Sequence, residues 1–195
     1  AVPGDPQFDL SWGLRNQGQA VDGVSGVAGN DIAAPEAWDH RTDCTGIPVA
    51  VLDTGINYTH SDLAANMWSG ASNHGKDFVG EGDDDPMSEG GIHGTHVAGI
   101  IAAQGDNTVG STGVCWKAEI MAVRVLDADG RGTTQTLMEG IDYAVSQGAK
   151  VLNLSLTGFK KDGYVRDALA NARDQGVLAV AAAGNAGEDV DGDRK

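Results

Sequence analysis

The stretch Val49-Ala50-Val51-Leu52-Asp53-Thr54-Gly55 contains the pattern that decides the fold class of this chain. A short, continuous apolar run that ends in a polar turn is typical of a strand buried on both faces, as strands of a parallel sheet are. Three further runs have the same character, at 120–125, 151–156 and 177–183. We therefore expect these four segments to be strands of one parallel sheet.

Helical patterns lie between and before these runs, at 34–40, 94–103, 134–146 and 164–174. Strands that alternate with helices predict an α/β fold with a parallel sheet and right-handed crossovers. No internal repeat, low-complexity tract or linker divides the 195 residues, so we expect one domain or part of one.

The composition excludes several classes of partner. Apolar residues make up 41% and charged residues 21%, as in ordinary folded proteins, and the net charge is -15. Nucleic acids and anionic membranes would repel such a surface, and no stretch approaches the ~20 apolar residues of a membrane span. The charge suits binding of hard cations such as calcium, although a solvated acidic surface accounts for most of it. The first residues have no signal-peptide pattern, which a secreted protein also lacks after processing.

Three polar residues stand where catalytic groups gather in such folds. Asp53 follows the first strand, His93 opens a helical segment, and Asn185 follows the run 177–183. Ligands of open parallel sheets bind at the carboxyl ends of the strands, so we expect all three near one edge. Such a set supplies an orienting carboxylate, a general base and an oxyanion stabiliser for acyl transfer. Each residue alone has an ordinary structural explanation; the combination favours catalysis.

Four motifs resemble those of the subtilisin-like serine peptidases. The stretch 49–56 resembles their aspartate motif and His93-Gly94-Thr95-His96-Val97-Ala98-Gly99 their histidine motif, while 153–156 and 181–185 resemble the substrate-binding strand and the oxyanion segment. Order and spacing agree, and the opening residues 5–14 are similar to those of the thermitase-like branch. The resemblance implies a three-layer, parallel-sheet subtilisin-like fold, incomplete here, with 1–195 as the N-terminal portion of a single secreted peptidase domain.

The resemblance also implies roles for individual residues. Asp53 would orient His93, which would act as general base and then acid, and Asn185 would donate to the oxyanion. Polypeptide substrates would contact Gly130, Arg131, Gly132, Ser155, Leu156, Thr157, Gly158, Ala183 and Gly184. Thr157 stands where glycine is common in the family, which leaves the width of the first specificity pocket open.

The family's nucleophilic serine lies in a Gly-Thr-Ser-x-Ala motif, which this sequence lacks. We expect the chain alone to be inactive, with the serine on a C-terminal remainder of the domain or on a second chain. The alternative is a non-catalytic fragment that only binds peptide or its complement. A propeptide or a protein inhibitor is a further partner that the family implies.

Two other classes of site fit the sequence less well. A zinc site on His93 and His96 lacks further ligands at suitable spacing. A nucleotide-binding domain would need a glycine-rich turn after the first strand, which is absent.

The family further implies structural calcium, held by carboxylate, amide and carbonyl oxygens. A first site would use Asp5, Asp62, Gly105, Asn107, Val109 and Ser111. A second could use Asp77, Asp83, Asp85 and the carbonyl of Met87, where a solvated acidic loop is the other explanation.

Cys44 and Cys115 each lie five residues before an apolar run, at Val49 and Ile120. The family's sheet order implies that these two runs are parallel neighbours, which would place both cysteines at the same level. Adjacent strands lie ~4.8 Å apart, within the reach of a disulfide. We therefore expect a Cys44–Cys115 disulfide, with two reduced core thiols as the alternative.

Overall fold

The structure of the chain is a computed structural model, and its description covers residues 1–71, 73–80, 84–158 and 162–187. Five parallel strands form the main sheet in the order β4-β5-β3-β6-β7. Their bounds are Val49–Asp53 for β3, Gly75–Asp77 for β4, Ile120–Arg124 for β5, Val151–Leu154 for β6 and Leu178–Ala181 for β7.

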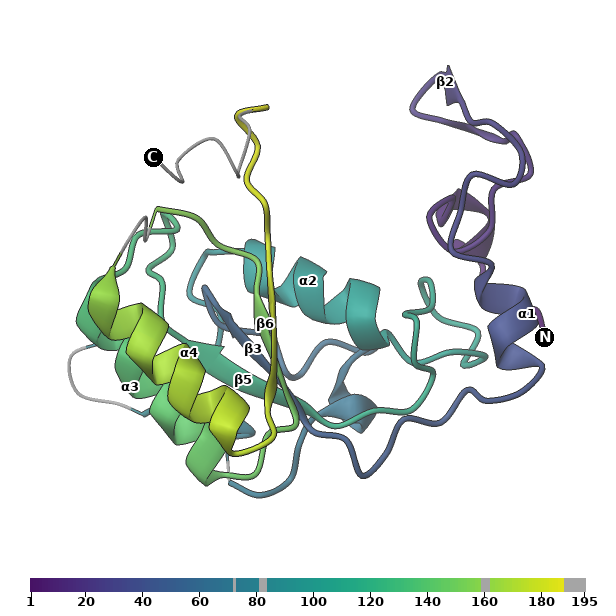
Figure 1. The fold of residues 1–195 in the computed structure, drawn as a ribbon. Coiled ribbons are helices and arrows are strands. Elements are labelled where there is room, and N and C mark those ends of the chain that lie inside the picture. The colour runs from purple at the N-terminus through teal and green to yellow at the C-terminus, as the bar shows by residue number, and fades with distance from the viewer. Residues whose placement is uncertain (72, 81–83, 159–161, 188–195) are drawn as a thin grey trace.

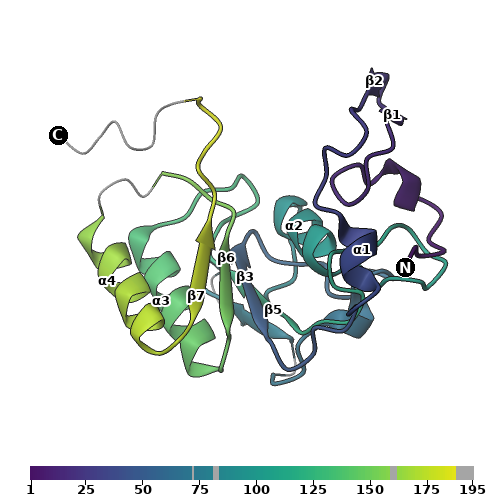
Figure 2. The same ribbon diagram turned by 45° about the vertical axis from the view of Figure 1, so that its right-hand side comes forward.

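Helices cover both faces of this sheet (Figures 1 and 2). Helix α2, His93–Ala102, lies on one face, while α3, Thr134–Ser146, and α4, Gly163–Asp174, lie together on the other. The predicted three-layer α/β arrangement is confirmed.

Side chains of the central strand β3 alternate between two apolar clusters. Ala50 and Leu52 pack in the cluster that includes Ile141 of α3, whereas Val51 packs in the cluster that includes Ala98 of α2. Because successive side chains of a strand point to opposite faces, one continuous apolar run can fill both clusters. The sheet is therefore buried on both sides, and polar groups gather where its strands end.

An N-terminal arm, residues 1–41, lies beside the α2 layer (Figure 1). It contains the 3-10 helix η1, Phe8–Leu10, the two-stranded hairpin of β1, Ala20–Val21, and β2, Val24–Ser25, and helix α1, Ala34–Trp38; a second 3-10 helix, η2, spans Ala64–Asn66. Phe8, Leu14 and Trp38 form a third apolar cluster, against which Trp116 packs. The Trp38 indole donates to the carbonyl of Val114 at 2.8 Å.

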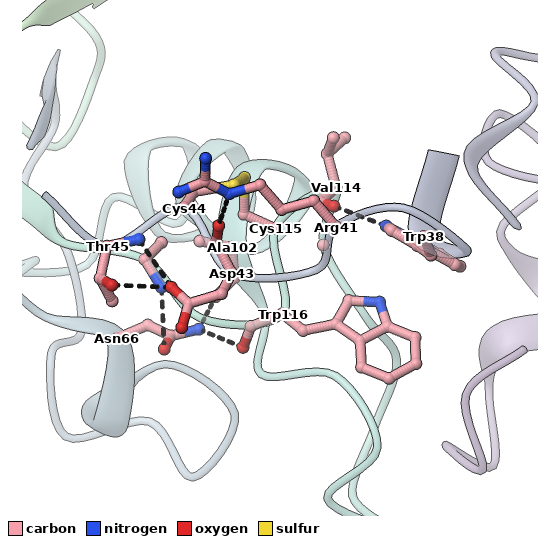
Figure 3. The surroundings of a disulfide bond; sticks show 12 residues. Trp38, Arg41, Asp43, Cys44, Thr45, Asn66, Ala102, Val114, Cys115 and Trp116 are labelled. Carbon is pink, nitrogen blue, oxygen red and sulfur yellow. Dashed lines mark hydrogen bonds between the residues drawn. A yellow bond between two sulfur atoms is a disulfide. The ribbon is translucent and has the colours of Figure 1, made fainter. Parts of the chain in front are cut away.

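A disulfide joins Cys44 to Cys115 beside this arm, with a Cα–Cα distance of 5.9 Å (Figure 3). The strand register pairs Val49 with Ile120, so the two cysteines lie at the same level, five residues before the paired strands. The predicted disulfide and its strand register are confirmed. No helix in the described ranges has both the length and the apolar character needed to cross a membrane.

Candidate active site

Asp53 is the last residue of β3 and is fully buried. Its Oδ1 accepts a hydrogen bond from the Thr54 amide at 2.7 Å. Its backbone carbonyl accepts from the amides of Val125 and Leu126, at 2.9 and 3.1 Å, just beyond the end of β5. The buried carboxylate is thus held at the carboxyl edge of the sheet, where the sequence predicted it.

His93 is the first residue of α2, and its ring meets the buried carboxylate. Its Nδ1 lies 2.8 Å from Asp53 Oδ1 and 2.9 Å from Oδ2, while 54% of the side chain stays exposed. A carboxylate on Nδ1 favours the tautomer with a proton there, which leaves the Nε2 lone pair free to accept a proton. A histidine held in this way can act chemically as an oriented general base.

Gly94 allows this contact, because α2 begins very close to the turn that follows β3. A Cβ on Gly94 would lie 2.3 Å from the carbonyl oxygen of Gly55 and 3.0 Å from Asp53 Cβ. The Gly94 amide donates to Thr54 Oγ1 at 3.1 Å. The first turn of the helix therefore rests directly on the strand end that carries Asp53.

A cleft opens beside His93, between segments that follow β3, β5 and β6. Its lining residues are Thr54, Gly90, Gly91, Ile92, His93, Leu126, Ala128, Asp129, Gly130, Ser155, Leu156 and Thr157. The structure thus brings four of the predicted substrate-binding residues to His93: Gly130, Ser155, Leu156 and Thr157. Arg131, Gly132, Gly158, Ala183 and Gly184 are not among its lining residues.

Asn185 lies in the exposed segment that follows β7, at the same edge of the sheet. It too is not among the residues that line the cleft. The hydrogen bond from the Ala182 amide to the Leu154 carbonyl, at 3.1 Å, keeps the start of this segment beside the end of β6. The structure therefore places Asn185 beyond the end of β7, at the predicted edge of the sheet, but not in the cleft wall.

An ion-pair network at the end of β5 was not predicted from the sequence. Arg124, which pairs in register with Asp53, donates from Nη1 to Asp77 Oδ2 and to Glu89 Oε2, each at 3.0 Å. Arg124 and Asp77 are almost fully buried, whereas Glu89 is 66% exposed. Glu89 belongs to the loop that leads to Gly90, Gly91 and His93, so this network ties a cleft wall to the sheet. An arginine ending an apolar run was the available signal.

The residues predicted for a second calcium site have other partners. Asp77 binds Arg124, and Asp85 accepts from the Tyr58 hydroxyl at 3.0 and 3.1 Å and from the Met87 amide at 3.1 Å. Asp83 lies outside the described residues. Among the described residues, no three His, Cys, Asp or Glu side chains gather as a metal-binding group.

The residues predicted for the first calcium site lie together around Asn107. Asp5 accepts from the backbone amides of Asp106, Asn107 and Thr108, at 2.7 to 3.1 Å. Asp62 accepts from Asn107 Nδ2 at 2.8 Å and from the Ser111 amide at 3.1 Å. Gly105 and Val109 lie in the same loop, 105–111, which therefore joins the N-terminal arm to the segment before η2.

Comparison with known proteins agrees with the family resemblance of the sequence motifs. A model of the subtilase family matches residues 44–194. The chain is 45% identical over 156 residues to thermitase of Thermoactinomyces vulgaris, covering 80% of this chain and 53% of that protein. It is 44% identical over 157 residues to subtilisin BL of Lederbergia lenta, covering 80% and 54% respectively.

A third relative, the cell wall-associated protease of Bacillus subtilis (strain 168), is 40% identical over 195 residues, which is 97% of this chain and 20% of that protein. The chain thus spans about half the length of thermitase and of subtilisin BL. The family model and the relatives together establish that the chain belongs to the subtilase family of serine peptidases.

Proposed function

We propose that this chain supplies the aspartate, the histidine and an oxyanion donor of a site that hydrolyses peptide bonds. The observation that carries the proposal is the contact between His93 Nδ1 and the buried carboxylate of Asp53, beside a cleft that His93 lines. We infer that residues 1–195 form the N-terminal portion of one peptidase domain. The serine nucleophile would come from residues outside this sequence, so the chain alone would not turn over substrate.

The chemistry follows from the two ring nitrogens of His93. As the serine hydroxyl attacks the substrate carbonyl, Nε2 accepts its proton, and it later returns that proton to the leaving amine. Asp53 stabilises the imidazolium that forms, since its carboxylate already binds Nδ1. Asn185 would donate its side-chain amide to the oxyanion, which requires it to turn toward the cleft once the nucleophile segment is present.

Substrate would lie as an extended peptide between two segments of the cleft. Gly130, with Arg131 and Gly132 next to it, belongs to one wall, and Ser155, Leu156 and Thr157 belong to the other. Backbone pairing of an extended peptide with such segments is a common way to bind polypeptides without regard to most side chains. A propeptide or a protein inhibitor would use the same walls.

The loop 105–111 has the donors that a structural calcium ion requires. Asp5 and Asp62 are each about 5% exposed, and within the described residues neither forms a salt bridge with a cationic side chain. A Cβ on Gly110 would lie 2.5 Å from Asp62 Oδ2, so the loop closes tightly on this carboxylate. Buried carboxylates without a counter-charge suit a hard cation. Asn107 Nδ2 donates to Asp62 and its Oδ1 accepts from the Val109 amide at 2.7 Å, so the Asn107 amide would have to turn its oxygen toward a bound ion. Asp5, Asp62 and Asn107 would hold the ion, and it would supply that counter-charge.

A secreted location agrees with the Cys44–Cys115 disulfide, because disulfides persist mainly in oxidising compartments.

The test uses a protein that contains this chain together with its serine-bearing segment. Asp53→Asn should lower kcat on an internally quenched peptide by about 10⁴-fold, and His93→Ala by at least as much. His96→Ala is the matched control, since His96 lies one turn along α2 on the exposed surface and should leave turnover unchanged. Full turnover in His93→Ala would contradict the proposal, and peptide binding without hydrolysis by the unaltered protein would favour a non-catalytic role.

A further inference from the structure

Thr157 lies in the cleft wall with His93, and its methyl group reaches toward the segment that follows β7. A Cβ placed on Gly184 would lie 3.8 Å from Thr157 Cγ2. Since a carbon–carbon bond is about 1.5 Å long, Thr157 Cγ2 lies no more than about 5.3 Å from Gly184 Cα. The two segments thus approach each other at this point.

This separation is too small to admit a substrate group. Carbon atoms in contact stay about 3.5 to 4.0 Å apart, so an atom placed between two carbons requires a gap of about 7 Å. No side chain can pass between the Thr157 methyl group and Gly184 as they stand. With glycine at position 157, the methyl group and Cβ would be absent, and the wall facing Gly184 would begin at the Cα of residue 157, two bonds behind the present methyl carbon.

Paired strands hold the starts of the two walls together. Leu154 of β6 pairs in register with Ala181 of β7, and the Ala182 amide continues the pairing to the Leu154 carbonyl. Gly184 has a φ of +96°, a conformation that side-chain-bearing residues rarely adopt. Thr157 carries two heavy atoms on Cβ, so only one of its three staggered rotamers leaves the position facing Gly184 vacant.

We propose that Thr157 restricts the substrate residue before the scissile bond to small side chains, such as alanine or serine, and disfavours phenylalanine, tyrosine and leucine. This inference rests on the proposed function, because the attacked carbonyl must lie beside His93. Ser155, Leu156 and Thr157 line the same cleft as His93, so we infer that the side chain next to that carbonyl extends along them. A threonine where the family commonly has glycine therefore acts as a specificity-determining residue.

The test again uses the protein with its serine-bearing segment, and two peptides that differ only by alanine or phenylalanine before the scissile bond. The unaltered protein should favour the alanine peptide. Thr157→Gly should raise the phenylalanine-to-alanine ratio of kcat/KM by about tenfold or more, the scale at which a pocket discriminates side-chain size. Thr157→Val keeps the branched shape and should keep the preference, and hydrolysis of the alanine peptide reports that each variant is folded.

The outcomes separate the two proposals. An unchanged ratio in an active Thr157→Gly variant, or a preference of the unaltered protein for phenylalanine, would overturn the role of Thr157 and leave the peptidase assignment intact. Failure of the unaltered protein to hydrolyse either peptide or an unrelated protein substrate would overturn the proposed function, and this inference with it.

Discussion

At the scale of single residues, the contact between His93 and Asp53 depends on the absence of a side chain at Gly94. The peptide carbonyl of Gly55 occupies the space where a Cβ would stand, at 2.3 Å, and backbone atoms cannot yield as a flexible side chain can. Gly99 lies on the same helix and would meet no atom within 4 Å. The two glycines therefore offer a matched pair of substitutions.

Gly94→Ala should displace the first turn of α2 and lengthen the hydrogen bond from His93 Nδ1 to Asp53. We expect a fall in kcat of about 10²-fold, the cost typical of a small misplacement of a catalytic group. Gly99→Ala should leave kcat unchanged and raise helix stability by up to about 1 kcal/mol. Steady-state kinetics and urea denaturation measure both effects, and equal kcat values for the two variants would show that the close approach is unimportant.

The proximity of Asp53 and His93 could be predicted because both follow from local pattern: an apolar run ends at one and a helix begins at the other. The Arg124–Asp77–Glu89 network could not, since it joins residues that are 35 and 47 positions apart and no short motif connects them. Thr157 shows the same limit. The sequence showed an unusual residue just after the segment that resembles the family's substrate-binding strand, but only the distance from Thr157 to Gly184 gives the direction of the expected effect on substrate preference.

At the scale of elements, helix bounds agree with the sequence pattern better than strand bounds do. The helix predicted at 134–146 occupies Thr134–Ser146, whereas the run 151–156 is a strand only to Leu154. Ser155 and Leu156 leave the sheet and line the cleft, so an apolar run continues where the strand has ended. Strand β4 was not predicted, because Gly75-Lys76-Asp77 contains no apolar run. Glycine is needed at its first position, since a Cβ on Gly75 would lie 1.7 Å from the carbonyl oxygen of Ala122.

Asp162 connects the starts of two helices on the same face of the sheet. Its carboxylate accepts from the amides of Tyr164 and Val165, capping α4, and from the Thr134 hydroxyl at the first residue of α3. The Thr134 hydroxyl, with smaller help from the two amides, lowers the pKa of the Asp162 carboxyl below its ordinary value of 3.8. The ionised form is therefore favoured in the folded protein.

Asp162→Ala should lower the melting temperature by a few degrees, because α4 loses its N-terminal cap and its link to α3. A carboxyl whose folded pKa is depressed stabilises the protein above its unfolded pKa and loses this contribution as pH falls through the folded pKa. The difference from the unaltered protein should thus persist at pH 5 to 7 and shrink below pH 3.8. Asp162→Asn keeps a good capping side chain, so its melting temperature should fall less. Thermal melts across this pH range measure the effect. Equal melting temperatures of Asp162→Ala and the unaltered protein at pH 7 would contradict the role of Asp162.

At the scale of the whole molecule, the loop 105–111 ties the N-terminal arm to the rest of the fold. Asp5 reaches amides about a hundred positions away, and Asp62 joins the same loop from the segment before η2. A ligand that binds only the folded state stabilises it by about 2.7 kcal/mol at a hundredfold excess over its Kd.

Calcium should therefore raise the melting temperature, and a chelator should lower it by several degrees. Asp62→Ala should abolish the difference between the two conditions. Asp142→Ala removes an exposed carboxylate on α3 and should preserve it, which controls for loss of charge alone. Identical melts with calcium and with chelator in the unaltered protein would count against a structural ion.

The Cys44–Cys115 disulfide joins positions 71 residues apart, and the loop that it closes contains β3, β4 and α2. Closing a loop of this length restricts the unfolded chain and is worth about 4 kcal/mol in the chain-entropy model. Replacing both cysteines by serine should lower the free energy of unfolding by up to that amount, measured by urea denaturation. The contact between His93 and Asp53 should persist, because pairing of Val49 with Ile120 sets the register of β3 and β5 without the disulfide.

The unaltered protein after reduction and alkylation should unfold at the same urea concentration as the double variant. Two freely alkylatable thiols in the unfolded, unreduced protein would show that the bond does not form, and would weaken the case for a secreted enzyme.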